Sequence, residues 1–119
     1  MSEIPRSVLD LEVIESLRML GGEDDPELFE DLVEIFLEQT PALIARLQEA
    51  FASNDAHALE RAAHSLKSSC ANLGALRLSA HFKEMEFAGR NKDLERVRPL
   101  LAESAREYTE VESALKRLL

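Results

Sequence analysis

A histidine followed by a lysine one helical turn later is the feature of this sequence best suited to chemistry. The stretch AAHSLKSSCANLGA, residues 62–75, places His64 in a helix-forming run, with Lys67 three positions after it. Small residues follow at Ser68, Ala71 and Gly74. Small side chains leave the imidazole uncovered, so a flat partner surface can reach the ring, and the lysine supplies a nearby positive charge. The spacing predicts an accessible histidine with a cation beside it.

The other side of the same helix has the spacing of a buried face. The apolar residues that recur at helical intervals are Leu59, Ala63, Leu66, Cys70 and Leu73. At about 100° per residue, His64 lies roughly 160° from Leu66 and therefore on the solvent side. Cys70 is interpreted as a small core residue, because it points inward with the leucines.

Other kinds of histidine site fit this pattern less well. His57 and His64 are seven residues apart, which is two turns and too far for one metal ion without further ligands, so no metal site is expected. No glycine-flanked nucleophile indicates a hydrolase, and no glycine-rich loop indicates ATP binding. On the helix pattern alone, an exposed histidine beside a solvated lysine with no chemical role stays an equal alternative.

Length, charge and cysteine content limit the partners and the location. The 119 residues fit one domain. A net charge of −9, from 23 acidic and 14 basic residues, would repel a phosphate backbone, so nucleic acid is not expected. No run approaches the roughly 18 apolar residues of a membrane span, which predicts a soluble protein. The single cysteine, Cys70, excludes an internal disulfide and fits a reducing compartment, which predicts a cytoplasmic location.

Start and stop signals predict five helices that position the histidine. Their expected ranges are 11–20, 26–51, 55–73, 76–88 and 93–119. Asp10 is the expected N-cap of the first helix, Asn54 or Asp55 caps the third, and Gly74 is expected to end the third helix in a left-handed conformation. Pro41 predicts a bend near Thr40 in the second helix rather than a division of it, and Pro99 leaves the start of the last helix open.

Apolar stripes on these helices predict the core. The second helix contributes Leu28, Leu32, Phe36, Leu43, Leu47 and Ala50. The fourth helix contributes Leu78, Phe82, Met85 and Gly89. The last helix contributes Leu94, Val97, Leu101, Ala105, Tyr108, Val111, Leu115 and Leu118. Amphipathic helices joined by short links favour an all-α fold, an antiparallel four-helix bundle with an additional short N-terminal helix. We expect the cover helix at about residues 10–20 and the bundle at about 25–118.

The string from Ala63 to Ser68, with Gly74 ten residues after the histidine, resembles the signature of histidine-containing phosphotransfer (HPt) domains of multistep two-component signalling. The resemblance extends over roughly residues 10–118, so residues 1–119 are interpreted as a single HPt-like domain. It implies an elongated four-helix bundle with an exposed phosphorylated histidine. Ser68 stands where the family usually has glycine. Histidine kinase dimerisation domains fit less well, because an acidic residue generally follows their histidine and here Ser65 does.

The resemblance also implies a mechanism and partners. His64 would take a phosphoryl group through Nε2 from the phospho-aspartate of a receiver domain and pass it to another receiver. Lys67 would stabilise the phosphoryl group. No carboxylate cluster is evident around His64, so the Mg²⁺ is expected in the receiver and no cofactor is expected in this chain. Expected partners are response-regulator receiver domains and a hybrid sensor histidine kinase.

Several residues around the motif are candidates for contact with these partners. Docking candidates are Arg61, Leu76, Lys83, Phe87 and Arg90, with core packing preferred for Phe87. The chain would be a monomeric carrier without kinase or hydrolase activity of its own. The alternative is a docking module that regulates a signalling partner while His64 stays unphosphorylated.

Overall fold

The computed structural model describes residues 4–119, and this part of the chain contains helices and no β-strand. The elements are α1 (Leu11–Gly21), α2 (Leu28–Ala52), α3 (Ala56–Asn72), α4 (Leu76–Arg90), a 3-10 turn η1 (Leu94–Arg96) and α5 (Arg98–Leu118). The expected all-α class is confirmed.

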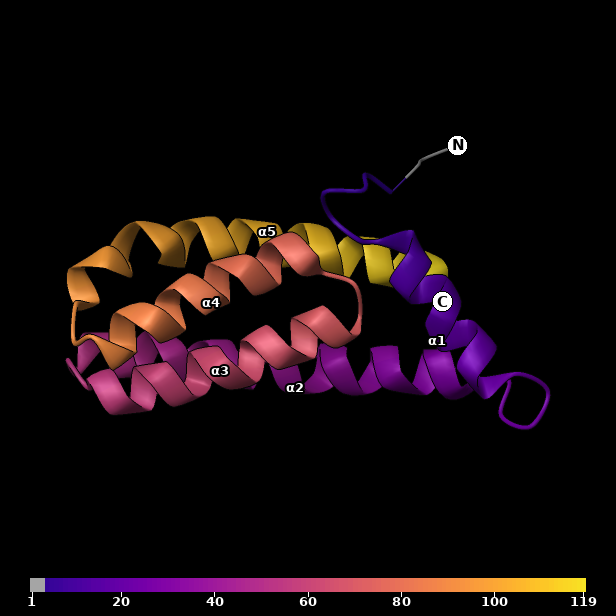
Figure 1. Cartoon of the computed structure of the whole chain (residues 1–119), viewed down its shortest axis with the longest axis horizontal. Helices are drawn as coiled ribbons and strands as arrows, with labels where there is room; N and C mark the ends of the chain where they lie inside the picture. Colours follow the sequence, from indigo (N-terminus) through magenta and orange to yellow (C-terminus); the bar gives the residue numbers. More distant parts are fainter. Residues whose placement is uncertain (1–3) are drawn as a thin grey trace.

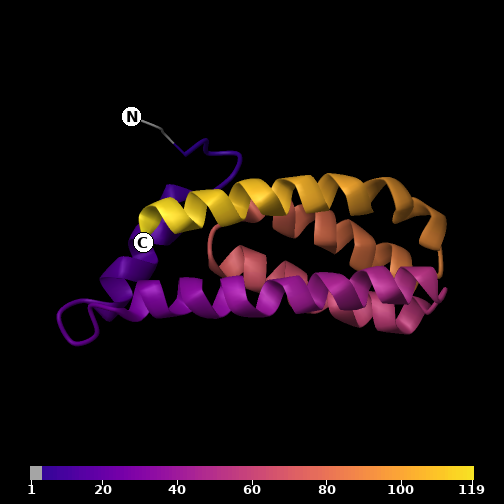
Figure 2. The ribbon, with the colours of Figure 1, turned by 180° about the vertical axis from the view of Figure 1, so that it is seen from behind.

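Helices α2 to α5 lie lengthwise beside one another, each antiparallel to the one before it (Figure 1). The molecule is elongated, with extents of 47 × 29 × 19 Å. Helix α1 lies across the end of the bundle where α2 begins and α5 ends, as both views show (Figure 2). There the Arg18 guanidinium donates to the Leu118 carbonyl oxygen at 3.3 Å. The predicted four-helix bundle with a short additional N-terminal helix is confirmed.

Local signals define the starts of α1 and α3 and the end of α3. The Asp10 carboxylate accepts a hydrogen bond from the Glu12 amide at 2.9 Å, and Asp55 accepts one from the Ala58 amide at 3.0 Å. Gly74 has a φ of 79°, the left-handed conformation that glycine adopts without strain. A Cβ atom there would also lie 2.9 Å from the Asp10 carbonyl oxygen. The turn between α3 and α4 therefore requires glycine for two reasons.

Three helix boundaries differ from the expected ones by two residues or more. Helix α2 begins at Leu28 and not at Pro26, because the Leu28 amide bonds to the Asp25 carbonyl oxygen in a separate turn. Helix α4 continues two residues further, to Arg90. Helix α5 begins at Arg98, with Pro99 in its first turn, where a missing amide hydrogen costs nothing. Helix α2 runs unbroken through Pro41, so it is not divided there.

The core is as expected on α3 and α4 but differs on α2 and α5. All five predicted core residues of α3 and all four of α4 are buried. On α2, Phe29 and Val33 are buried, whereas the predicted Leu28 and Leu32 are only half-buried. On α5, Ala105 is exposed and the neighbouring Ser104 is buried. Adjacent positions differ by about 100° around a helix, so contacts with the neighbouring helices decide which of two adjacent stripes is covered.

Helices α3 and α4 approach closely at Gly89. A Cβ atom on Gly89 would lie 3.0 Å from the Ala56 carbonyl oxygen and 3.0 Å from the Glu60 amide nitrogen. Both are backbone atoms of α3 or its first turn, so neither can move aside as a flexible side chain could. The absence of a side chain at position 89 therefore sets the separation of the two helices.

Replacing Gly89 with alanine should lower the free energy of unfolding. Overpacking a close contact costs about 1–3 kcal/mol, and alanine recovers no more than about 1 kcal/mol of helix propensity. We expect a net loss of ~1 kcal/mol in urea denaturation. Ser113→Ala, at an exposed position of α5, is the control and should change stability by less than ~0.5 kcal/mol. Unchanged stability of Gly89→Ala would contradict a backbone contact that fixes the helix separation.

Candidate functional site

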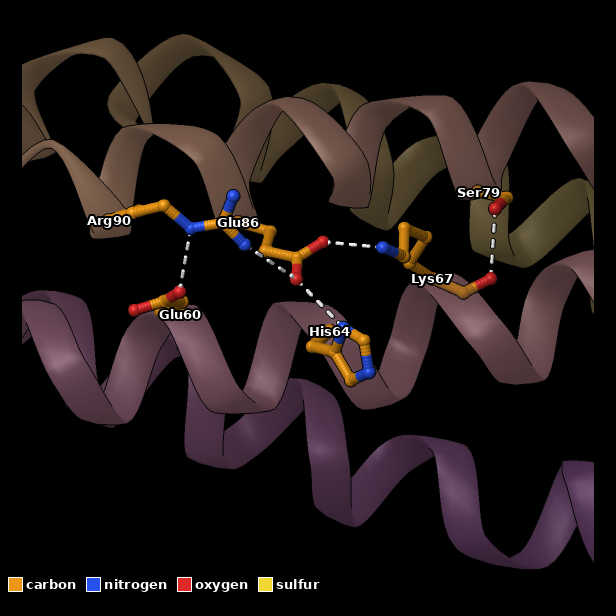
Figure 3. A network of polar contacts seen from close by, with 6 residues as sticks. All are labelled: Glu60, His64, Lys67, Ser79, Glu86 and Arg90. Atoms are coloured by element: carbon orange, nitrogen blue, oxygen red, sulfur yellow. Dashed lines mark hydrogen bonds and ion pairs between the residues drawn. The ribbon is translucent and has the colours of Figure 1, made fainter.

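His64 lies on α3 with its imidazole at the surface and one edge against α4. The side chain is 59% exposed, and Nδ1 lies 2.7 Å from Oε2 of Glu86. Figure 3 shows the second ring nitrogen on the side of the ring away from Glu86. The histidine is therefore exposed, as expected, but its ring is also held by a residue of the next helix.

Glu86 is a buried carboxylate that contacts both His64 and Lys67. Its side chain is 9% exposed, Oε2 contacts His64, and Oε1 accepts a hydrogen bond from Nζ of Lys67 at 2.7 Å. Burial by itself would raise the pKa of the Glu86 carboxyl. The hydrogen bonds from Lys67 and His64, together with the positive charge of Lys67, outweigh burial, so the pKa of Glu86 lies below its usual value of 4.5. Glu86 is therefore ionised at neutral pH.

An ionised carboxylate assigns the proton on the imidazole. A carboxylate can only accept hydrogen bonds, so the 2.7 Å contact requires a hydrogen on Nδ1 of His64. In the neutral ring the other nitrogen, Nε2, then has no hydrogen and carries a free lone pair. The exposed nitrogen of His64 is thus the nucleophilic one.

A second ion pair continues this network along the α3–α4 contact. Nε of Arg90 donates to Oε2 of Glu60 at 3.0 Å, and the Arg90 guanidinium lies 3.5 Å from Oε2 of Glu86. The Ser79 hydroxyl, on α4, donates to the Lys67 carbonyl oxygen at 2.8 Å. Figure 3 shows all six residues along one seam between the two helices. The seam fixes the position of α4 relative to His64.

A groove of about 750 Å³ lies beside the imidazole, between α2, α3 and the end of α4. We call it the His64 groove. Apolar residues in it include Leu43, Ala50 and Ala62, and charged residues include Arg46, Arg61 and Arg90. Within the described part of the chain, no three His, Cys, Asp or Glu side chains come together in a way that could hold a metal ion.

The other residues predicted for the site lie on α3, in the turn after it and on α4. Ser68 is exposed on the next turn of α3, and Ala71 is half-buried. Gly74 is buried in the turn against Asp10, so the structure places it at the turn and not beside the imidazole. Arg61 lines the His64 groove. Leu76, Lys83, Phe87 and Arg90 are all exposed on α4.

This geometry agrees with comparisons against known proteins. The family model described as the Hpt domain matches residues 31–119, including every residue of the seam. The chain belongs to the Hpt domain family. It is accordingly a phosphotransfer intermediate of phosphorelays, a carrier of the phosphoryl group, and domains of this family work with receiver domains and histidine kinases.

Two solved structures resemble this Hpt domain over most of their length. The crystal structure of histidine-containing phosphotransfer protein B (HptB) from Pseudomonas aeruginosa PAO1 is 32% identical, with a TM-score of 0.84, and the match covers 92% of this chain and 91% of that one. The HPT domain of a sensor hybrid histidine kinase from Shewanella has the same fold, at 21% identity and a TM-score of 0.77, with 97% and 96% covered. A search of curated proteins finds no match. Among the helices of residues 4–119, none is long and apolar enough to cross a membrane.

Two features of the site differ from what the sequence analysis expected. Glu86 contacts His64 directly, although Glu86 is not among the site residues predicted from the sequence. Phe87 is 55% exposed, so the preference for core packing at this position was wrong. Glu86 lies at the edge of the buried stripe that includes Phe82 and Gly89. The spacing of apolar residues within one helix does not show whether a residue at such an edge faces another helix.

A signal for Glu86 does exist in the spacing around the turn. His64 and Glu86 are equally distant along the chain from Ala75, and so are Glu60 and Arg90. Two antiparallel helices rise equally per residue, so residues equally far from a tight turn come to lie side by side. A search for residues of opposite charge or hydrogen-bonding type at equal distances before and after Ala75 would have found both pairs.

The pH dependence of stability should differ between the wild type and Glu86→Gln. Because the pKa of Glu86 is lowered on folding, its ionised form stabilises the fold above the unfolded-state pKa, and this contribution is lost as pH falls through the folded-state value. At pH 7 we expect Glu86→Gln to be ~1–2 kcal/mol less stable. Urea denaturation from pH 7 to pH 3 should show that difference shrinking. A difference independent of pH would contradict an ionised Glu86.

Proposed function

We propose that His64 is the residue that carries the phosphoryl group. The observation that supports this most directly is the 2.7 Å contact between Nδ1 and Glu86, because it places the hydrogen of the neutral ring on Nδ1 and leaves the lone pair of the neutral ring on Nε2, facing solvent. The Nε2 lone pair attacks the phosphorus of a receiver's aspartyl phosphate. A nitrogen–phosphorus bond forms, the acyl phosphate oxygen–phosphorus bond breaks, and the receiver's aspartate leaves as a carboxylate. The onward transfer is the same step in reverse, toward a second receiver.

Glu86 would act as a positioning residue in this step. Attack by a neutral imidazole that keeps its Nδ1 hydrogen leaves a positive charge on the ring. The buried Glu86 carboxylate already faces that nitrogen, so it stabilises the charge without rearrangement. The same contact holds the ring plane, so that Nε2 points outward.

Lys67 would stabilise the transferred phosphoryl group. An ammonium group has three hydrogen-bond donors, and Glu86 uses one of them, so donors remain for phosphoryl oxygens. The Lys67 side chain is 29% exposed, so solvent limits its contribution to ~1 kcal/mol. The small residues Ser68 and Ala71 leave room for the receiver next to the ring.

The rest of the proposal concerns partners and context. We place the Mg²⁺ in the acidic pocket of the receiver and assign no cofactor to this chain. The donor and acceptor would be receiver domains, one of them belonging to a hybrid sensor histidine kinase. The chain would act as a cytoplasmic monomer and have no kinase or hydrolase activity of its own.

The first test is phosphoryl transfer from a phosphorylated receiver. Wild type should acquire phosphate that is labile in acid and stable in base, and His64→Gln should acquire none. His57→Gln is a matched control, because His57 is an exposed histidine two turns earlier on the same helix, and it should be labelled as wild type is. Label retained by His64→Gln would contradict the assignment, and no label from any of several receivers would favour a phosphorylation-independent docking module.

Removal of the Lys67 charge should slow transfer without preventing it. Loss of ~1 kcal/mol of transition-state stabilisation corresponds to about a fivefold lower rate for Lys67→Met. Single-turnover transfer at saturating receiver measures the chemical step. Lys116→Met, on α5 far along the chain from the site, is the control and should transfer at the wild-type rate. An unchanged rate for Lys67→Met would show that the lysine has only a structural role.

A further inference from the structure

A large aromatic side chain is exposed on α4 directly after Glu86. Phe87 is 55% exposed, although it belongs to the same helix as the buried carboxylate. It lines a hollow of about 340 Å³ on the side of α4 away from the His64 groove. We call this the Phe87 hollow. Apolar side chains in a surface hollow are typical anchors of protein interfaces.

The charges around the Phe87 hollow are opposite in sign to the charge of the chain. Four cations line it, Lys67, Lys83, Arg90 and Arg96, together with two carboxylates. Lys83 and Arg96 form no side-chain ion pair within residues 4–119, so their charge faces solvent. The chain as a whole carries −9. An acidic partner would therefore be repelled by most of the surface and attracted here.

The Phe87 hollow is continuous with the phosphotransfer site. Lys67, Glu86 and Arg90 line the hollow and also form the seam beside His64 (Figure 3). A partner that reaches Nε2 of His64 therefore lies close enough to contact the outer face of α4. The His64 groove and the Phe87 hollow flank the seam on its two sides.

We propose that the Phe87 hollow is a second contact surface for a receiver domain whose phosphorylation site is rimmed by acidic side chains. Phe87 inserts into an apolar spot on the receiver, and Lys83 and Arg96 attract its acidic rim. The surface sets the affinity and the encounter rate, whereas His64, Glu86 and Lys67 perform the chemistry. This inference rests on the proposed function, because it assumes that a receiver docks over His64.

The experiment compares transfer from a phosphorylated receiver with transfer from phosphoramidate, a small phosphodonor that needs no docking surface. The variants are Phe87→Ala and the double variant Lys83→Glu/Arg96→Glu. Controls are Met19→Ala, a 73% exposed apolar residue on α1, and Arg106→Glu/Arg117→Glu on α5, which changes the net charge equally. The readouts are the half-saturating receiver concentration and the maximal rate, at low and high salt.

Both test variants should raise the half-saturating receiver concentration by about tenfold and leave the maximal rate and labelling by phosphoramidate unchanged. For the charge variant the difference from wild type should shrink at high salt, because screening removes steering. Wild-type half-saturation in both variants would overturn the docking surface while the proposed function stands. Loss of labelling by phosphoramidate in these variants would also overturn the docking surface, because the substituted residues would then be needed for the phosphoryl transfer itself. A wild-type chain that takes phosphate from neither donor would refute the proposed function itself.

Discussion

The contact between the buried Glu86 carboxylate and the exposed His64 ring is the interaction on which the rest of the site depends. Taking an ionised carboxylate out of water is costly unless charged hydrogen bonds replace the lost hydration. Lys67 and His64 each supply such a bond at 2.7 Å, and the Arg90 guanidinium lies 3.5 Å from the same carboxylate. The burial of Glu86 thus requires that both partners stay in place. That requirement turns two surface side chains of α3, which would otherwise sample several rotamers, into oriented groups.

Helix packing must be accurate for this contact to form. A hydrogen bond weakens steeply when its length or angle departs from the ideal, so a small change in the separation of α3 and α4 would weaken both bonds of Glu86. Gly89 allows the backbones to approach at one end of the seam, and Gly74 closes the turn at the other. The Ser79 hydroxyl ties α4 to the Lys67 carbonyl oxygen between them. These contacts hold the carboxylate at bonding distance from the imidazole.

The features that could be predicted from the sequence are those that depend on residues close together along the chain. The cap at Asp10, the stop at Gly74 and the buried stripe of α3 each depend on residues within a few turns and are as expected, and the cap of α3 is Asp55, one of its two candidates. On α2 and α5, the predictions for Leu28, Leu32 and Ala105 were wrong by one position, because contacts between helices decide which neighbour is buried. Glu86 was missed and Phe87 was wrongly placed in the core for the same reason. The accessible imidazole of His64 was found because its exposure follows from the stripe of its own helix.

The position of Glu86 at Nδ1 also bears on how tightly the carrier would hold its phosphoryl group. A phosphoryl group on Nε2 adds negative charge across the ring from a carboxylate. At an effective dielectric of 20, two like unit charges about 7 Å apart repel by roughly 2 kcal/mol. Without compensation, that repulsion would make the phosphorylated form difficult to reach. Lys67 and Arg90 contribute positive charge beside Glu86, so they offset part of this repulsion.

A carrier must accept the phosphoryl group from one aspartate and release it to another, so the free energy of its phosphorylated form cannot lie far below that of either aspartyl phosphate. With His64 as the proposed carrier, a carboxylate that activates the ring and repels the product, next to cations that offset the repulsion, would keep the two directions of transfer close in free energy.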